Sequence, residues 1–367
     1  MSEHDRVERL IALAAEPDLD LLLIGDLVHP GDSGREAISN LRWLTGFSGT
    51  SGLAIVGPAD RIFVTDFRYL ERARREISAD FEHVIAEREL VGDAAKRLTG
   101  RVGYDDVHTS VRMLRKLEEL APDGVELVEV GGLVERLRRH KDEAELEAIA
   151  EAARLADEAY EWVLGRGVVG RTEREVMLAA HQRMRELGAS DPSFPAIVAA
   201  GENSALPHHE SSEREVRAGE VLLIDFGAIV DGYCSDCTRT VATGEIGDEA
   251  RGVYELVRSA QRMALEAVRA GVAAQEADGA ARDPIAAAGH GDHFGHGLGH
   301  GVGLEVHEAP RLTRKSDQVL EPGDVVTIEP AVYLPGRFGV RIEDLVAVTE
   351  DGCRNFCGTD KDLRVVG

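Results

Sequence analysis

Three carboxylates in the second half of the chain lie where burial is expected. Asp225 follows the apolar run 221–224, Glu329 follows the run 325–328, and Glu343 lies within a further apolar stretch. A buried carboxylate is costly unless it is paired with a cation or bound to a metal. These positions therefore require a source of positive charge.

Two explanations supply that charge. Arg239 and Arg341 could form buried ion pairs with the acids, and for a single carboxylate this would be the favoured explanation. Three such acids, together with a glycine- and histidine-rich loop at 289–303, favour metal binding instead. The sequence thus predicts a metal centre with five ligands: Asp225, Asp236, His300, Glu329 and Glu343.

This ligand set indicates the kind of metal and the kind of chemistry. Oxygen-rich ligation with one imidazole suits Mn²⁺, Fe²⁺, Co²⁺ or Zn²⁺. Four carboxylates carry enough charge to offset two divalent ions, and two adjacent ions can bridge and deprotonate one water. Such a centre hydrolyses bonds without a side-chain nucleophile, and no Gly-x-Ser-x-Gly motif suggests a serine hydrolase.

The glycine-rich loop adds histidines to this set. His296, His300 and His307 are separated by glycines, and His208 lies in a histidine pair further upstream. Glycines let the backbone approach a ligand closely, so we interpret these histidines as part of the site and His209 as a surface or supporting residue. A phosphate-binding loop is the alternative, but no Gly-Lys-Ser/Thr occurs and no strand pattern precedes the loop.

Four cysteines form a CxxC pair and a CxxxC pair, which together could bind zinc. Cys234 and Cys237 flank Asp236, whereas Cys353 and Cys357 lie far along the chain, and no ribbon-like sequence surrounds either pair. Free thiols, as expected in a reducing cytoplasm, are the favoured interpretation.

Composition excludes several classes of partner. The chain carries 67 acidic and 42 basic residues, a formal charge of −25. A surface this negative repels nucleic acid and anionic membranes, so neither is an expected partner. No apolar run approaches the ~18 residues that span a bilayer, and the acidic N-terminus is unlike a signal peptide. We therefore expect a cytoplasmic protein.

The acid excess, with only five lysines, suits a salt-rich cytoplasm, because salt screens the repulsion between like charges. We expect folding and activity to improve as KCl is raised, which unfolding curves and rate assays over a KCl series would measure. Indifference to KCl would contradict this hypothesis.

The pattern of elements divides the chain in two. The first 135 or so residues alternate strand and helix patterns, which is typical of an α/β domain. A long helical segment follows at 133–163, and we place the boundary near Lys141. The expected domains are 1–140 and 141–367.

In the second domain, strands cluster apart from long helices. This indicates an α+β arrangement, with helices packed outside a mostly antiparallel sheet. The expected helices are 173–187, 249–270 and 274–288, and the expected strands are 194–199, 221–229, 238–241, 325–333 and 340–348.

The order of these motifs resembles one family, the pita-bread metallopeptidases, which include methionine aminopeptidase, aminopeptidase P, prolidase and creatinase. Asp225 is followed by Asp236, then by HGLGHGVGLEVHE at 296–308, Glu-Pro at 329–330 and Arg-Ile-Glu-Asp at 341–344. The resemblance covers essentially the whole chain. It implies an α+β pita-bread catalytic domain preceded by a smaller α/β creatinase-like domain.

Two motifs in the first domain narrow the resemblance. NLRWLTGFSG at 40–49 and TDFRY at 65–69 are similar to the N-terminal domain of the Xaa-Pro branch of the family. Methionine aminopeptidases lack that domain. The resemblance therefore points to prolidase, an Xaa-Pro dipeptidase, or to aminopeptidase P, an Xaa-Pro aminopeptidase.

The resemblance implies a role for each ligand. Asp225 would chelate one of two divalent metal ions, Asp236 and Glu343 would bridge both, and His300 and Glu329 would complete the second. Mn²⁺ or Co²⁺ are the expected ions, with Zn²⁺ or Fe²⁺ as alternatives. A hydroxide bridging the metals would attack the scissile carbonyl, with Glu329 as a catalytic proton shuttle.

It also implies residues that contact the substrate. His208 and His307 would bind the substrate and stabilise the tetrahedral intermediate, which makes them expected catalytic residues. His296 would shape the pocket for proline, Tyr333 would lie near the metals and Arg341 near the substrate. The implied substrate is a peptide with proline at its second position, and a homodimer is the expected assembly.

Several functions stay open at this point. A dipeptidase and an aminopeptidase differ in whether the groove beyond the proline site is blocked, which the sequence does not show. A hydrolase of another amide, such as a compatible solute, is a third hypothesis. A non-catalytic binding protein on the same fold is a fourth. The complete ligand set argues against it, and against a metal-free enzyme such as creatinase.

Overall fold

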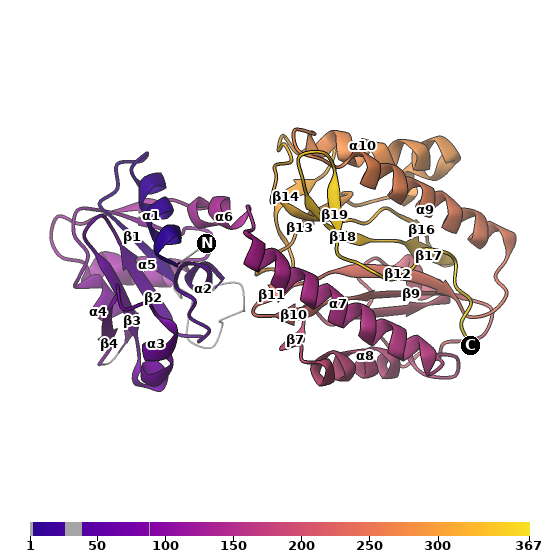
Figure 1. Cartoon of the computed structure of the whole chain (residues 1–367), viewed down its shortest axis with the longest axis horizontal. Coiled ribbons are helices and arrows are strands. Elements are labelled where there is room, and N and C mark those ends of the chain that lie inside the picture. Colours follow the sequence, from indigo (N-terminus) through magenta and orange to yellow (C-terminus); the bar gives the residue numbers. More distant parts are fainter. Residues whose placement is uncertain (1–2, 26–38, 88) are drawn as a thin grey trace. The chain divides into compact units, whose positions relative to one another are not determined.

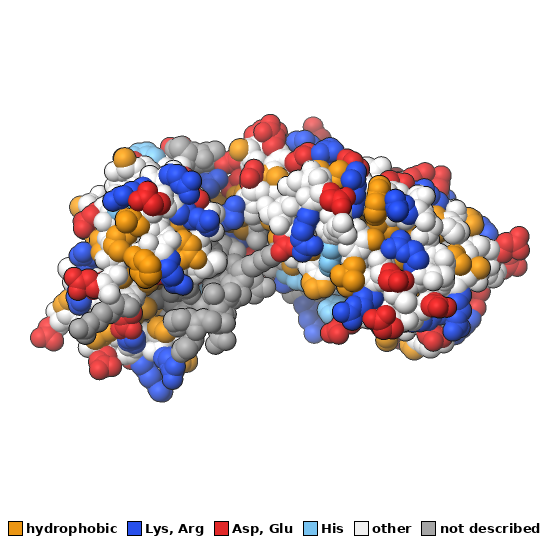
Figure 2. All heavy atoms as spheres, turned by 90° about the horizontal axis from the view of Figure 1, so that it is seen from below, with side chains coloured by type: hydrophobic (Ala, Val, Ile, Leu, Met, Phe, Trp, Pro, Cys, Tyr) orange, Lys and Arg blue, Asp and Glu red, His pale blue; other side chains and the backbone are white. Residues whose placement is uncertain are grey.

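The computed structural model describes residues 3–25, 39–87 and 89–367. The chain folds as two compact units, Met1–Arg138 and Arg139–Gly367 (Figure 1). In the part of the chain that the structure describes, no helix is both long and apolar enough to cross a membrane. Acidic and basic side chains are interspersed over both units on the face drawn in Figure 2.

The N-terminal unit contains one six-stranded sheet and short helices. Its elements are α1 (Glu3–Ala14), β1 (Leu21–Gly25), α2 (Ser39–Thr45), β2 (Gly52–Val56), β3 (Arg61–Thr65), α3 (Leu70–Glu76), β4 (Glu82–Ile85), α4 (Leu90–Ala95), β5 (Arg101–Tyr104), α5 (Val111–Leu120), β6 (Glu126–Glu129) and α6 (Leu133–Arg138). The strand order is β4-β3-β2-β1-β5-β6. The sheet is mixed, because β1 pairs antiparallel with β2 but parallel with β5. The central strand β2 is buried at every position, as expected of a strand covered on both faces.

The larger unit combines four long helices with four small sheets. Its helices are α7 (Glu143–Gly165), α8 (Glu173–Leu187), α9 (Asp248–Ala267) and α10 (Ala274–Ile285). Its strands are β7 (Asp191–Pro192), β8 (Ile197–Ala200), β9 (Val221–Phe226), β10 (Ala228–Val230), β11 (Tyr233–Cys234), β12 (Cys237–Ala242), β13 (Gly299–Gly301), β14 (Glu308–Leu312), β15 (Val325–Ile328), β16 (Ala331–Leu334), β17 (Phe338–Arg341), β18 (Asp344–Val348) and β19 (Cys353–Asn355).

These strands pair only antiparallel with one another. The sheets have the orders β12-β9-β8, β11-β10-β7, β14-β13-β15-β18-β19 and β16-β17. Within this unit, α7 and α8 lie along one side of the strands and α9 and α10 along the other (Figure 1). The mixed α+β composition that the sequence predicts is confirmed.

Each helix pair buries its own apolar core. α7 and α8 pack against β8, β9 and β12 through residues such as Leu155, Val176 and Ile224. α9 and α10 pack against β15 to β18 through residues such as Val257 and Val326. The strands between the two cores are therefore covered from both sides, and polar residues there lie in a largely apolar surrounding.

The helix ends follow local sequence signals. Asp142 caps α7 and forms a reciprocal capping box with Glu145, so the segment 133–163 is two helices and not the single one that the sequence predicts. Thr172 and Glu175 form the same box at the start of α8. These caps fix where α7 and α8 begin.

Three strands predicted as continuous are each broken in two. The segment 221–229 is interrupted at Gly227, the segment 325–333 at 329–330, and the segment 340–348 at 342–343. Pro330 has no N–H to donate to a strand ladder, which explains the break at 329–330. The last two breaks coincide with predicted metal ligands, so those carboxylates leave the regular pairing of the sheet.

Candidate metal centre

The predicted ligands lie in or directly beside strands of two different sheets. Asp225 belongs to β9, Asp236 directly precedes β12, His300 is in β13, Glu329 directly follows β15 and Glu343 directly precedes β18. All five line one cleft of ≈ 540 Å³. A cleft of this size suits a small ligand such as a short peptide.

The ligand atoms converge closely. One atom each from Asp236, His300 and Glu343 lie within 4.8 Å of one another. His300 Nε2 is 3.6 Å from Asp236 Oδ2 and 3.5 Å from Glu329 Oε1. Four of the five residues are less than 9% exposed; Glu329 is intermediate overall, with a side chain that is 16% exposed.

The crowding of carboxylates makes their ionisation costly. Burial raises the pKa of Asp236 well above its usual range, and the neighbouring carboxylates of Glu343, Asp225 and Glu329 raise it further. Burial, with Glu329 and Asp225, raises the pKa of Glu343 well above its usual range in the same way. Burial also raises the pKa of Glu329 to about 7, although Arg341 opposes the shift. The site thus concentrates negative charge that a cation would relieve.

The buried ion pairs considered from the sequence account for only part of this charge. Arg341 Nη2 contacts Asp225 Oδ2 at 2.7 Å, whereas Arg239 pairs with Asp344. Among the described residues, no hydrogen-bond donor reaches the buried Oδ1 of Asp225. A buried carboxylate oxygen without a hydrogen-bond donor can instead bind a cation. The residues present therefore fit divalent metal ions.

The histidines are held in the form that binds metal. Burial lowers the pKa of His300 to about 3, with a further contribution from His307. Burial and then Arg341 lower the pKa of His296 to about 4. Both rings are therefore neutral near pH 7, and a neutral imidazole nitrogen is a metal ligand.

The remaining predicted site residues surround the ligands. His208, His296, His307 and Arg341 all line the same cleft. The ring of His307 packs edge-on against His300 with centroids 4.4 Å apart. His296 Nε2 lies 3.1 Å from the Tyr333 hydroxyl, so this ring is linked to strand β16. Their contacts with a substrate stay predictions.

The glycines beside His300 have a different role from the one expected. A Cβ added to Gly299 would lie 1.9 Å from Thr327 O, and one added to Gly301 would lie 2.1 Å from Ala309 O. Glycine is therefore required at these two positions by neighbouring backbone, not by the approach of a ligand. The close packing of strands sets the place of the imidazole.

Thr238 is a supporting residue that the sequence analysis missed. It lies opposite Asp225 in the register of β9 and β12. Its hydroxyl donates to Glu343 Oε2 at 2.6 Å and accepts from Arg341 Nε at 2.9 Å. Thr238 thus links Glu343 to the buried guanidinium of Arg341, which itself contacts Asp225.

Replacing Thr238 with valine, which has nearly the same shape, is expected to weaken metal affinity by roughly 10- to 100-fold, as for other groups that orient metal ligands. The change removes the donor to Glu343 and leaves Arg341 Nε without its acceptor. Competition titration against a chelator measures the affinity. Thr238→Ser keeps the hydroxyl and should stay near the wild type; equal losses in both variants would contradict this role.

Other missed residues form the walls of the cleft. Phe194, Pro195 and Ile197 supply apolar surface, and Arg311 supplies a guanidinium. Arg311 lies directly opposite His300 in the register of β13 and β14. Only that strand pairing identifies it, because no local motif marks this arginine.

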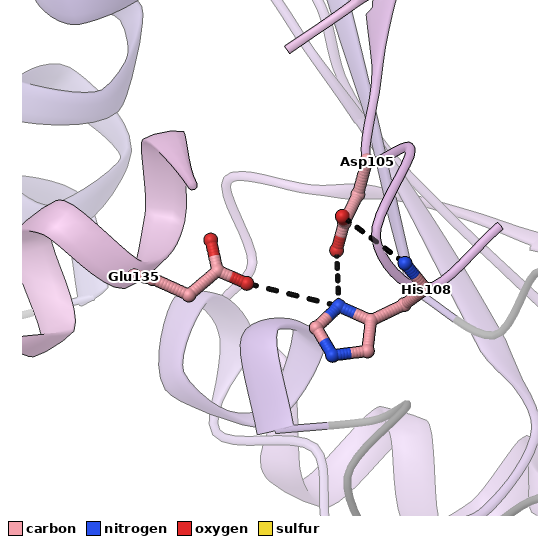
Figure 3. A group of neighbouring side chains, drawn as sticks. All are labelled: Asp105, His108 and Glu135. Carbon is pink, nitrogen blue, oxygen red and sulfur yellow. Dashed lines mark hydrogen bonds and ion pairs between the residues drawn. The ribbon is translucent and has the colours of Figure 1, made fainter. Parts of the chain in front are cut away.

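A second group of possible metal ligands lies in the N-terminal unit: Asp105, His108 and Glu135. Figure 3 shows both carboxylates turned toward the same imidazole nitrogen, His108 Nδ1, at 2.7 and 3.7 Å. The amide nitrogen of Asn40 also donates to both carboxylates, at 3.1 and 2.7 Å, and its orientation is set by Arg138, which donates to Asn40 Oδ1. Since hydrogen-bond donors already satisfy these oxygens, we assign no ion to this group.

The cysteines do not assemble into a metal site in the described part of the chain, because neither group of possible ligands there includes one. Cys234 Sγ contacts Leu304 O at 3.8 Å and Cys237 Sγ contacts Glu343 O at 3.5 Å. All four are free thiols in the structure.

Comparison with known proteins agrees with this arrangement. Residues 147–350 match metallopeptidase family M24, and residues 6–140 match the creatinase/prolidase N-terminal domain. An Xaa-Pro dipeptidase of Pyrococcus furiosus is 32% identical over 375 aligned positions, which cover 98% of this chain and 99% of the relative.

Solved structures are similar over the whole chain. An Xaa-Pro dipeptidase from Bacillus anthracis is 36% identical with a TM-score of 0.93, and the match covers 100% of both chains. An X-Pro aminopeptidase from Thermotoga maritima is 34% identical with a TM-score of 0.89, covering 99% of this chain and 100% of that one. With its predicted ligands in one cleft and its fold shared throughout, this chain belongs to metallopeptidase family M24 and carries the creatinase/prolidase N-terminal domain.

Proposed function

We propose that this metallopeptidase uses two divalent ions to hydrolyse Xaa-Pro peptide bonds. The observation that carries the proposal is the convergence of four carboxylates, three of them buried, and one neutral imidazole in a peptide-sized cleft. The ions would be held by the five residues named as ligands, with Mn²⁺ or Co²⁺ expected and Zn²⁺ or Fe²⁺ as alternatives. Bound there, they would supply Lewis acidity that activates water and polarises a carbonyl.

The surrounding side chains have properties suited to the rest of the reaction. Glu329, whose carboxylate lines the cleft 3.5 Å from His300 Nε2, is the proposed proton shuttle. His208 and His307 lie on the wall of the cleft and are the proposed partners of the substrate carbonyl oxygen. His296 and Arg341 are the further proposed substrate contacts.

Proline at the second position of the substrate fits the cleft chemically. Its amide nitrogen carries no hydrogen, so the site need not supply an acceptor for it. Its ring can pack against the apolar walls formed by Phe194, Pro195 and Ile197. The names of the relatives, which are Xaa-Pro dipeptidase and X-Pro aminopeptidase, support the same substrate class.

The test is hydrolysis of Ala-Pro and Leu-Pro beside the tripeptide Leu-Pro-Pro. Chelated protein is assayed at low and high KCl with Mn²⁺, Co²⁺, Zn²⁺ or Fe²⁺ added back. Cleavage of dipeptides alone, restored by metal, identifies a dipeptidase, and cleavage of the tripeptide identifies an aminopeptidase. If metal binds and neither is cleaved, the proline assignment is wrong, and a screen of other amides follows.

Arg311 offers a way to separate the two peptidases. A dipeptide places its terminal carboxylate one residue beyond the scissile bond, where a guanidinium on the cleft wall can bind it. We expect Arg311→Gln to raise KM for Leu-Pro by about 10-fold, with a smaller effect on Leu-Pro-Pro, whose carboxylate lies one residue further away.

Steady-state kinetics on both peptides measures this difference. Arg314→Gln is the matched control, because Arg314 is exposed and does not line the cleft. Equal changes in KM for the two peptides would show that Arg311 does not bind the terminal carboxylate.

We further propose that the protein is cytoplasmic, as its sequence suggests, and a homodimer, as the family resemblance implies. Light scattering coupled to size-exclusion chromatography measures the mass in solution. A monomeric mass at assay concentration would contradict the assembly, but not the peptidase activity.

A further inference from the structure

Glu173 is a buried carboxylate that the proposed reaction does not use. It is the first residue of α8, its side chain is 0% exposed, and among the described residues it forms an ion pair with His209. Burying a carboxylate requires compensation. The hydrogen-bond donors around the Glu173 carboxylate therefore indicate its role.

Among the described residues, the hydrogen bonds to its side chain all come from one segment, 200–212. Oε1 accepts from Ala200 N at 2.8 Å and from Asn203 Nδ2 at 2.9 Å. Oε2 lies 2.8 Å from His209 Nε2 and accepts from the backbone and hydroxyl of Ser212 at 3.0 and 2.6 Å. One carboxylate thus ties together the beginning, the middle and the end of this segment.

The carboxylate is ionised in this setting. Burial opposes ionisation, but the hydrogen bonds from Ser212, Ala200, His209 and Asn203 outweigh it and hold the pKa of Glu173 below its ordinary value. The start of α8 also favours negative charge, because its first backbone N–H groups have no partner within the helix.

The segment carries His208 into the cleft. Residues 206–209 form a turn closed by a hydrogen bond from His209 N to Leu206 O at 3.2 Å. Proline is favoured at the second position of such turns, and His208 follows Pro207 there. His208 and His209 both line the cleft, and His209 is also bonded to Glu173. Holding His209 therefore holds the turn that presents His208.

Backbone pairing does not replace this anchor over the whole segment. Arg174 N bonds to Ser212 O and Glu173 N to Arg214 O, which fixes the chain from 212 onward. Before residue 212, Ser204 Oγ accepts from Gly339 N and Pro207 O accepts a 3.4 Å bond from Arg341, while Ser211 Oγ accepts from Val198 N and donates to Ala196 O. The Glu173 carboxylate is the group that joins both ends of the turn to α8.

We propose that Glu173 is a positioning residue, which holds segment 200–212 so that His208 faces the substrate carbonyl. The role given to His208 rests on the proposed peptidase function. The anchoring of the segment by Glu173 does not depend on that function. It assigns a use in catalysis to a carboxylate that touches neither the ligands nor the cleft.

The test is Glu173→Gln. Glutamine keeps the shape of glutamate, but one of its two oxygens is replaced by an NH₂ group, which cannot accept a hydrogen bond. This group must face one of two sets of donors, either Ala200 and Asn203 or His209 and Ser212. The segment must then shift. We expect kcat to fall by up to about 100-fold with KM nearly unchanged, because a misplaced group that acts in the transition state lowers kcat. Metal stoichiometry should stay the same.

A double-mutant cycle with His208→Ala shows whether Glu173 acts through His208. If it does, Glu173→Gln costs far less activity in the His208→Ala background than in the wild type. If the two losses multiply, Glu173 acts independently of His208 and the proposal is wrong. Glu175→Gln is the matched control, because it lies in the same first turn, is exposed, and glutamine also forms a capping box.

A second readout does not depend on activity. Hydrogen exchange followed by mass spectrometry should show faster exchange of residues 201–212 in Glu173→Gln, with β9 and α9 unchanged. Unchanged exchange in 201–212 overturns the proposal, whatever the substrate proves to be. If the wild type cleaves no Xaa-Pro peptide but exchange changes as expected, the proposed function fails while the anchoring stands.

If Glu173→Gln does not fold, Ser212→Ala replaces it. This variant removes one donor to Oε2, and Ser212→Thr restores the hydroxyl. The proposal expects a smaller fall in kcat for alanine and its recovery for threonine. Equal activity of the alanine variant and the wild type, with unchanged exchange, would contradict the proposal.

Discussion

Replacing Asp236 with asparagine is expected to abolish activity, with kcat/KM falling by at least about 1000-fold. Asparagine keeps the shape but removes the negative charge from the centre of the ligand group, between His300 and Glu343. A divalent ion contributes several kcal/mol of charge stabilisation to the transition state, and each ~1.4 kcal/mol corresponds to a factor of ten in rate. The same change should weaken metal binding more than Thr238→Val does.

Metal content by elemental analysis and peptide hydrolysis measure this effect together. Asp231→Asn is the matched control: the chemical change is the same, the position is exposed, and the φ of +48° is one that asparagine tolerates. Without metal, Asp236→Asn should be at least as stable as the wild type, because an amide needs no proton to stay buried. Full metal content with full activity in Asp236→Asn would remove Asp236 from the ligand set.

The second large effect concerns the stability of the metal-free protein, which we expect to fall as pH rises above about 6.5. The pKa of Glu329 is raised by burial from 4.5 to about 7, and burial raises those of Asp236 and Glu343 well above their usual range. A carboxyl with a raised pKa holds its proton in the folded state after the unfolded chain has lost it. Each one then costs about 1.4 kcal/mol of unfolding free energy for every pH unit, until the pH passes its folded pKa.

Two buried histidines set the lower pH limit of this fall in stability. His300 and His296 have pKa values lowered by burial to about 3 and 4, so the unfolded chain binds protons more readily than the folded one below pH 6.5. Their contribution to stability is lost as pH falls, which opposes the carboxylates there. Above pH 6.5 both rings are neutral in the folded and the unfolded chain, so they no longer oppose the carboxylates.

Denaturant unfolding of chelated protein over pH 6.5–9 measures the slope, with KCl added to screen surface charges. Protein loaded with Mn²⁺ should show a flatter profile, because bound cations keep the carboxylates ionised without repulsion. Glu329→Gln removes one titrating group and should reduce the slope near pH 7. A metal-free profile as flat as the loaded one would show that these carboxylates do not share one buried site.

The sequence was sufficient for much of the chemistry. Asp225, Glu329 and Glu343 could be recognised because acids within apolar runs need a positive partner wherever the strands lie. All nine site residues predicted from the sequence line one cleft. Their roles as ligands and catalytic groups stay predictions until the variants are measured.

Strand boundaries near the site were the weak point. Periodicity marks 325–333 and 340–348 as continuous strands, yet both break at a predicted ligand. Alternation of apolar residues reports burial and not hydrogen bonding, so it does not show where a ladder stops. The break in 325–333 could have been found from Pro330, whereas the one at 342–343 has no such local signal.

What the sequence by itself determined is the set of chemical groups, their order and the class of fold, because these depend on residue type and local spacing. What only the tertiary structure decided is which distant residues support them. Thr238 meets Asp225, and Arg311 meets His300, through cross-strand register. Glu173 holds a segment that begins 27 residues away. Register and long-range hydrogen bonds arise when separate segments pack together, and the spacing of residues along a single chain does not specify that packing.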